Sequence, residues 1–222
     1  DSIYVQDINI KSQKIAGLKK LTVTSDILEG EIEGKYYFKE LFGASTNNLV
    51  KFIPSLHQEN LKQVKLSNDF KFDVTILNTD LISKLILSGV ELGKNSTLHG
   101  AYNSVSQSLL LKAKFPTVNS SFMKVNNLEV DGETSLKTLF LNVFAEKIYQ
   151  TDSIFLENFK TSSIVQNDSI LTNIKWINND TISKTEAKVN FNTYFRGLND
   201  FSTHFYDSHF MIDDTLWTVN EN

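Results

Sequence analysis

The chain has no cysteine, only two prolines and only nine glycines in 222 residues. Without cysteine it has no disulfide bond, no thiol nucleophile and no thiolate metal ligand, so its strands must hold themselves together. No apolar run approaches the roughly 20 residues that a transmembrane helix needs. The net charge is −4, with no large block of one sign. This pattern lacks the basic surface of a nucleic-acid-binding protein, and we expect no nucleic-acid partner.

Motifs for nucleotide binding and for serine catalysis are missing as well. There is no Gly-x-Ser-x-Gly elbow for a serine nucleophile. The nearest approach to a phosphate-binding loop, at 89–94, has one residue too few between its glycines. In addition, Asn95 stands where a Ser or Thr should bind magnesium. We interpret this segment as a turn.

The histidines and the acids do not form a site in the sequence. His204 and His209 are five residues apart, so on a strand they face opposite sides. Glu29, Glu31 and Glu33 share one strand face and could supply the carboxylate pair of a glycosidase. Three acids at alternate positions opposite an apolar face are, however, ordinarily the solvated side of a strand. We expect no enzymatic activity, no metal and no cofactor.

The sequence does contain a strand pattern that recurs along almost the whole chain. From Leu28 to Phe38, apolar or small residues occupy the even positions, and charged residues occupy most of the odd positions. Successive side chains of a strand point to opposite faces, so the even residues should face the interior and the glutamates should face water. The same alternation returns at 70–76, 109–115, 139–145 and 170–176. We predict an all-β protein with one long apolar surface.

The alternation stops at two places, which predict two short amphipathic helices. In 45–56, apolar residues follow helical spacing up to Pro54, which should kink or end the helix. In 80–87, Leu81, Ile82 and Leu85 share a helical face. Neither helix has the basic polar face of a membrane-surface helix. We therefore expect both helices to cover the apolar face of the sheet.

Beyond residue 90 the pattern predicts strands alone, with no crossover helix, and hence an antiparallel sheet. Typical turn residues mark the expected boundaries of these strands. The expected turns include 93–95, 117–120, 126–127, 131–132, 150–153, 167–168 and 197–200. Such spacing is compatible with a meander, a barrel, a sandwich or a solenoid.

Two stretches near the ends of the chain have a more specific pattern. The first begins with the strand Tyr4–Ile10 and continues from Leu18 to Phe38, with Ser-Asp-Ile-Leu and Gly-x-Ile-x-Gly before an aromatic strand. The second is Ser-His-Phe-Met-Ile-Asp-Asp-Thr-Leu-Trp at 208–217. Both resemble the TamB family, the inner-membrane-anchored subunit of the translocation and assembly module, with AsmA-like relatives, in its Bacteroidetes form. In that family Leu usually stands where Ile27 stands here, and the middle of the chain adds only generic alternation.

The resemblance implies that residues 1–222 are one internal segment of a long periplasmic protein. A segment outside this chain would tether that protein to the inner membrane. The implied fold is an elongated, curved antiparallel sheet that forms an open hydrophobic groove, with a taco-like cross-section. The family acts in outer-membrane protein assembly and in phospholipid transport between the two membranes, with a β-barrel of the outer-membrane assembly type as partner. No residue of the family is catalytic, so the resemblance implies no catalytic residue here.

The strand pattern and the resemblance together predict which side chains line the groove. They are Ile32, Tyr36, Phe38, Phe72, Val74, Leu111, Leu141, Val143, Ile170 and Ile174. We expect them to contact phospholipid acyl chains or nascent outer-membrane β-strands. One alternative is a surface adhesin or carbohydrate-binding domain, which would be a closed sandwich with exposed aromatic or calcium-binding loops. Another is a β-rich hydrolase, which would have a cleft with convergent acids.

Overall fold

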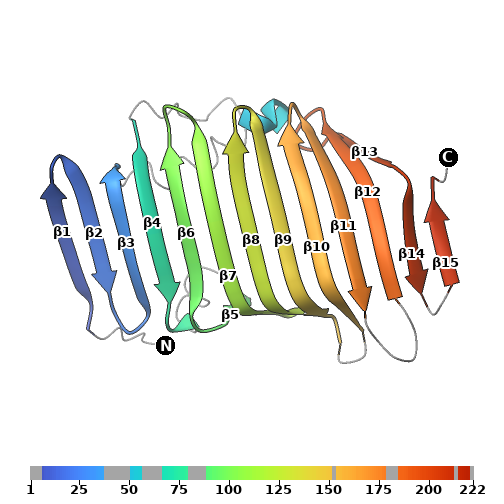
Figure 1. Cartoon of the computed structure of the whole chain (residues 1–222), viewed down its shortest axis with the longest axis horizontal. Coiled ribbons are helices and arrows are strands. Elements are labelled where there is room, and N and C mark those ends of the chain that lie inside the picture. The colour runs from blue at the N-terminus through green and yellow to red at the C-terminus, as the bar shows by residue number, and fades with distance from the viewer. Residues whose placement is uncertain are drawn as a thin grey trace.

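The computed structural model describes residues 7–37, 51–56, 67–79, 89–151, 154–178, 185–212 and 215–220. These residues form a single antiparallel sheet of 15 strands, seen broadside in Figure 1. The strands are β1 (Asn9–Ile15), β2 (Leu18–Thr24), β3 (Leu28–Lys35), β4 (Asp69–Ile76), β5 (Val90–Leu92), β6 (Ser96–Asn103), β7 (Ser108–Ser120), β8 (Lys124–Ser135), β9 (Thr138–Tyr149), β10 (Phe155–Gln166), β11 (Ser169–Asn178), β12 (Thr185–Phe195), β13 (Phe201–Phe205), β14 (Ser208–Ile212) and β15 (Thr215–Val219). A short 3-10 helix, η1 (Pro54–Leu56), accompanies them.

The sheet is a meander in which strands that follow each other in sequence usually pair. Its order runs from β1 at one edge to β15 at the other, and it is open at both edges. At two places, two short strands pair with the same edge of one long strand. Strands β5 and β6 both pair with β7, and β13 and β14 both pair with β12. Gly93 lies between β5 and β6, where an added Cβ would stand 2.7 Å from the Thr117 nitrogen. Glycine therefore lets the chain pass close to β7 at this point.

Tight turns explain why the sheet is antiparallel throughout. The connection from β10 to β11 consists of Asn167 and Asp168, both with positive φ (49° and 60°). Two positive φ values are typical of the two-residue hairpin turn whose twist matches that of paired strands, and Asn and Asp tolerate this conformation. Ala16 and Gly17 connect β1 to β2 with the same signs of φ. The all-β, antiparallel prediction is confirmed.

The pairing register brings the alternation of neighbouring strands into phase. Ile32 pairs with Leu21 on one side and with Phe72 on the other, while Glu31 pairs with Thr22 and Asp73. Paired residues point to the same side of a sheet. We call the side that carries Ile32 the apolar face and the side that carries Glu31 the polar face. The expected orientation of β3 is confirmed, since Tyr36 is 2% exposed and Glu29 and Glu33 are exposed.

Neither expected α-helix is seen as an element in the described part of the chain. Residues 80–87 lie outside it, as do 45–50 of the first expected helix. Within 51–56, Lys51 and Phe52 are helical, and η1 begins at Pro54. Proline suits the start of a helical turn because its φ is fixed and it has no N–H to donate.

Three of the expected turns are wrong, because long strands pass through them. Strand β7 continues to Ser120, and β8 contains both 126–127 and 131–132. Within β8, Gly132 pairs with Leu111 and with Leu141. Asn and Gly are typical of turns, but pairing with two long neighbours overrides that local preference.

The sheet has a very small core for its size. The accessible surface of the whole chain is 14769 Å². A compact protein of this mass exposes only about 10,300 Å². The described residues contain one cluster of fully buried apolar side chains, formed by Phe52, Ile53 and Val165. Most of the apolar face is therefore only partly covered.

Candidate functional site

The apolar face is the candidate site, and the register places nearly all of the expected lining on it. One row of paired residues crosses the sheet from Ile32 through Phe72, Gly100, Leu111 and Gly132 to Leu141. A parallel row, one pleat along each strand, contains Val74, Val143 and Ile174. Tyr36 and Ile170 lie on the same face, and Phe38 lies outside the described residues.

From Phe72 to Leu141, large residues and glycines alternate along the first row. The Phe72 ring lies over Gly100, where an added Cβ would stand 2.4 Å from two ring carbons. Gly132, two strands away, has more room, since an added Cβ would stand 3.7 Å from Leu111 and 3.8 Å from Leu141. The missing side chain at Gly132 leaves a low point between two leucines on the apolar face.

Several residues that complete this face could not be selected from the sequence. They belong to the second row, next to the residues that were selected, and they are Leu98, Ala113, Val130, Thr161 and Val189. Alternation assigns each of them to one face of its own strand. Only the register shows that the faces of separate strands coincide.

One end of the apolar face is covered by the chain itself. Phe52 (2% exposed) and Ile53 (5% exposed) pack on Val165, and Ile170 is one of the partly buried residues around them. The Ser55 N–H donates to Asp168 Oδ1 at 2.6 Å, and the Asp168 N–H donates to the Phe52 carbonyl at 3.2 Å. These bonds fix the segment on the β10–β11 hairpin. Ile170 is therefore packed by its own chain, whereas Leu141 and Ile174 lie outside this cluster.

An aromatic group surrounds the end of β3 on the same face. The Tyr36 ring lies edge-on to Phe70 at 6.3 Å, and Phe70 lies 5.8 Å from Tyr102. The Lys19 ammonium lies 5.6 Å from the centre of the Tyr36 ring and donates to the Tyr36 carbonyl at 3.2 Å. Burial raises the pKa of the Tyr36 phenol. This part of the face is closed by side chains and offers little free surface.

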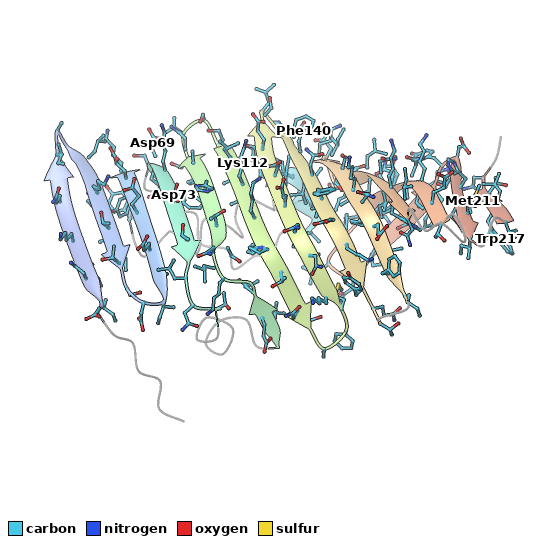
Figure 2. The ribbon with its side chains drawn as sticks, turned by 60° about the horizontal axis from the view of Figure 1, so that its bottom comes forward. Asp69, Asp73, Lys112, Phe140, Met211 and Trp217 are labelled. Atoms are coloured by element: carbon cyan, nitrogen blue, oxygen red, sulfur yellow. The ribbon has the colours of Figure 1, made fainter. Side chains whose placement is uncertain are left out.

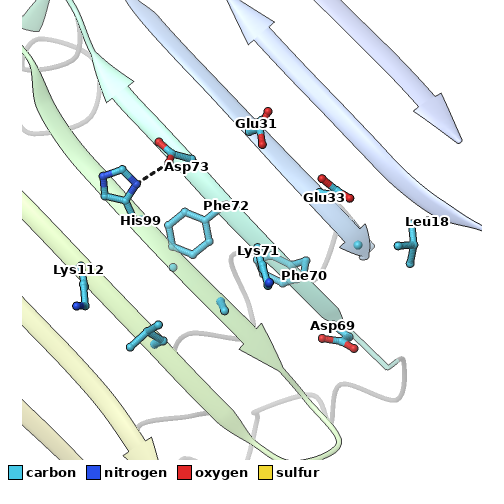
Figure 3. A pocket seen from close by; sticks show the side chains of 14 residues that line it. Leu18, Glu31, Glu33, Asp69, Phe70, Lys71, Phe72, Asp73, His99 and Lys112 are labelled. Atoms are coloured by element: carbon cyan, nitrogen blue, oxygen red, sulfur yellow. Dashed lines mark hydrogen bonds and ion pairs between the residues drawn. The ribbon is translucent and has the colours of Figure 1, made fainter. Parts of the chain in front are cut away.

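The polar face carries charged side chains that largely neutralise one another. A depression of about 670 Å³ lies over β3, β4, β6 and β7 (Figure 3). In it, Asp73 Oδ2 and His99 Nδ1 are 2.6 Å apart, with both side chains about half exposed. Beside it, Lys20 lies 3.0 Å from Glu31, and this hydrogen bond raises the pKa of the lysine. Acids held by bases on an exposed face do not favour the carboxylate pair of a hydrolase.

The part of the chain that the structure describes offers no grouped ligands for a metal. Within the described ranges, no three His, Asp or Glu side chains come together in a way that could hold an ion. Among the same residues, no helix has the length and hydropathy needed to cross a bilayer.

Comparison with known proteins leaves the family open. No family model, no curated protein and no solved structure matches the chain. The resemblance to the TamB family therefore stays a prediction, and so do the periplasmic location and the membrane tether.

Proposed function

We propose that this chain is a segment of a TamB-like, periplasm-spanning protein whose curved sheet forms a hydrophobic groove. The groove acts in phospholipid transport between the inner and outer membranes or in outer-membrane protein assembly. In the whole protein, a β-barrel of the outer-membrane assembly type is its partner. The apolar face is the working surface, and no side chain of it is catalytic.

The observation that carries this proposal is the single layer of the sheet. Leu111, Leu141, Val143 and Ile174 share one face and remain partly exposed. Soluble proteins normally cover such a surface with a second layer, because apolar area in water is unfavourable by about 25 cal/mol per Å². An apolar cargo supplies the same cover.

Acyl chains suit the length and the chemistry of this surface. Each methylene moved from water to an apolar surface contributes about 0.8 kcal/mol. A few contacted carbons therefore bind weakly, while a chain lying across many strands binds well. This combination lets cargo slide along the face without a deep trap. An adhesin of the sandwich type would need a second sheet, and the described residues form only one.

Photo-crosslinking in cells tests the proposal in the full-length protein. A photoreactive residue is placed at position 141 or 174 on the apolar face, and at position 31 or 33 on the polar face. We expect lipid labelling from 141 and 174 and little labelling from 31 and 33. Equal labelling from both faces would contradict a lipid-selective groove.

A matched pair of variants tests whether the groove is used for passage. Leu141→Asp places a carboxylate on the apolar face, where it opposes an acyl chain. Asn142→Asp places the same group on the exposed polar face of the same strand. We expect Leu141→Asp to block lipid labelling from position 174, and Asn142→Asp to leave it unchanged. Circular dichroism of both variants checks that the sheet is retained.

A further inference from the structure

A row of lysines crosses the polar face of the C-terminal half of the sheet. Lys160 on β10 pairs directly with Lys175 on β11, and Lys175 pairs directly with Lys188 on β12. His209 on β14 continues the row, as the partner of Lys188. Paired residues share a face and have Cβ atoms about 5 Å apart, so the three lysine side chains stand side by side on consecutive strands. We call Lys160, Lys175, Lys188 and His209 the lysine row.

The lysine row differs from other lysines of the polar face in its cross-strand partners, because Lys71 faces Glu33 and Lys112 faces Asp131, whereas the lysines of the row face one another. Lys20 and Lys114 each lie within 3.0 Å of a glutamate. Among the described residues, none of the three lysines of the row forms an ion pair. Like charges placed directly opposite each other destabilise a sheet. A bound anion would relieve this repulsion within the row.

Acids lie near the row on one side only, where Glu146 stands two residues from Phe144 on β9 and hydrogen-bonds Asn127. Phe144 pairs with Lys160 and separates it from Glu129, which Lys114 holds at 2.7 Å. On β12, Glu186 lies two residues from Lys188. The adjacent row of the same face contains hydroxyl and amide side chains alone on β9 to β12. These are Asn142, Ser162, Asn173 and Asn190.

We propose that the lysine row binds a ligand that carries at least two phosphate groups. One phosphate fits between ammonium groups on adjacent strands, and the row contains two such gaps between three lysines. Ammonium groups act as flexible point charges for phosphate oxygens, and the neighbouring Ser162 and Asn142 can donate hydrogen bonds. The phosphates come either from lipid headgroups at a membrane surface or from a soluble diphosphate. This site lies on the opposite face from the proposed groove and does not depend on it.

Binding of pyrophosphate to the purified protein tests the site directly. Isothermal titration calorimetry is carried out at low and at physiological salt, because screening weakens exposed charges. We expect saturable binding that weakens as salt is added. Lys175→Gln removes the central charge and should weaken binding roughly tenfold, the effect of one charge-assisted hydrogen bond. The matched control is Lys114→Gln, which removes a neutralised lysine from the same face and should leave the affinity unchanged.

Vesicles distinguish the two sources of phosphate. Sedimentation with vesicles of phosphatidylcholine containing phosphatidylglycerol is compared with sedimentation with pure phosphatidylcholine vesicles. Binding to the anionic vesicles that Lys175→Gln reduces, without pyrophosphate binding, assigns the row to lipid headgroups. Pyrophosphate binding without vesicle binding assigns it to a soluble ligand. Absence of both, or an equal loss in Lys175→Gln and Lys114→Gln, would overturn the proposal.

The unliganded protein gives a second readout. Removing the central charge relieves repulsion from both neighbours, so Lys175→Gln should raise the urea midpoint of the free protein. Addition of pyrophosphate should raise the midpoint of the wild type more than that of the variant. A variant with a lower midpoint in both conditions would show that Lys175 has a packing role, which contradicts an unneutralised row.

Discussion

Two glycines of the apolar face should respond in opposite ways to the same substitution. Gly100 and Gly132 occupy the same row and flank Leu111. At Gly100 an added Cβ would stand 2.4 Å from two carbons of the Phe72 ring and 2.7 Å from the Leu110 carbonyl oxygen. At Gly132 the nearest atoms would be 3.7 Å and 3.8 Å away, which is ordinary van der Waals contact. Neither glycine has a positive φ, so the φ angle does not exclude alanine at either position, and the difference lies in the contacts of the added Cβ.

The magnitudes follow from these distances. Replacing a glycine by alanine in a compatible conformation stabilises a protein by about 0.4–1 kcal/mol, because the unfolded chain loses freedom. Overpacking of a filled site costs about 1–3 kcal/mol. Gly132→Ala should therefore raise the free energy of unfolding by about 0.4–1 kcal/mol. Gly100→Ala should lower it by about 1–2 kcal/mol, since the Phe72 ring and the Leu110 backbone must both move.

Equilibrium urea unfolding followed by circular dichroism measures both variants, and equal m-values would show that the comparison concerns stability alone. A double variant, Gly100→Ala with Phe72→Leu, separates the ring contact from the backbone contact. The shorter leucine should recover part of the loss if the ring causes it. A Gly132→Ala variant as unstable as Gly100→Ala would refute the reasoning, because it would mean that the apolar face is filled at both positions.

Two further predictions concern the core and the sheet edge. Phe52→Ala should lower the free energy of unfolding by about 3–5 kcal/mol, because Phe52 fills the only buried apolar cluster of the described residues. Phe140→Ala on the polar face, where Phe140 is 40% exposed, should cost about 1 kcal/mol or less in the same urea assay, and similar losses would contradict the assigned core. At the edge, β15 has no charged residue and exposes Leu216 and Trp217 by 57% and 55%, whereas β1 carries Lys11 and Lys14 (Figure 2 labels Trp217). Strands β1 and β15 run in the same direction (Figure 1), so two copies stacked head to tail would pair them in parallel. Two copies continue the antiparallel sheet when β15 of one pairs with β15 of the other. Sedimentation velocity at high concentration should show dimers that Trp217→Lys abolishes and Lys11→Ala preserves; monomers at all concentrations would contradict an adhesive edge.

Local patterns predicted most of the strands and the orientation of β3. The alternation from Leu28 to Tyr36 required one apolar and one charged face, and burial of the glutamates by a one-residue slip would be costly. The turn at 167–168 was also readable, because Asn and Asp tolerate positive φ. By contrast, Asn127 and Gly132 have turn chemistry and yet lie inside β8. Their neighbours β7 and β9 extend past them, and this non-local pairing decides their conformation.

The candidate site was likewise predicted from the sequence only in part. Nine of the ten expected lining residues could be assigned to strand faces from alternation, and the tenth, Phe38, lies outside the described residues. Alternation could not show that Ile170 is packed beneath Phe52 and Ile53, because these segments are more than a hundred residues apart. Nor could it show Lys160, Lys175 and Lys188 as neighbours.

The sequence alone determined that this protein is built from strands with one apolar and one polar face, because a period of two is a local property of the chain. The tertiary structure decided which faces coincide, which strands lie at the open edges, and which part of the apolar surface the chain covers for itself. These depend on the cross-strand register, in which each residue acquires neighbours from strands that are distant in sequence. The lysine row and the rows of the apolar face exist only once that register is set.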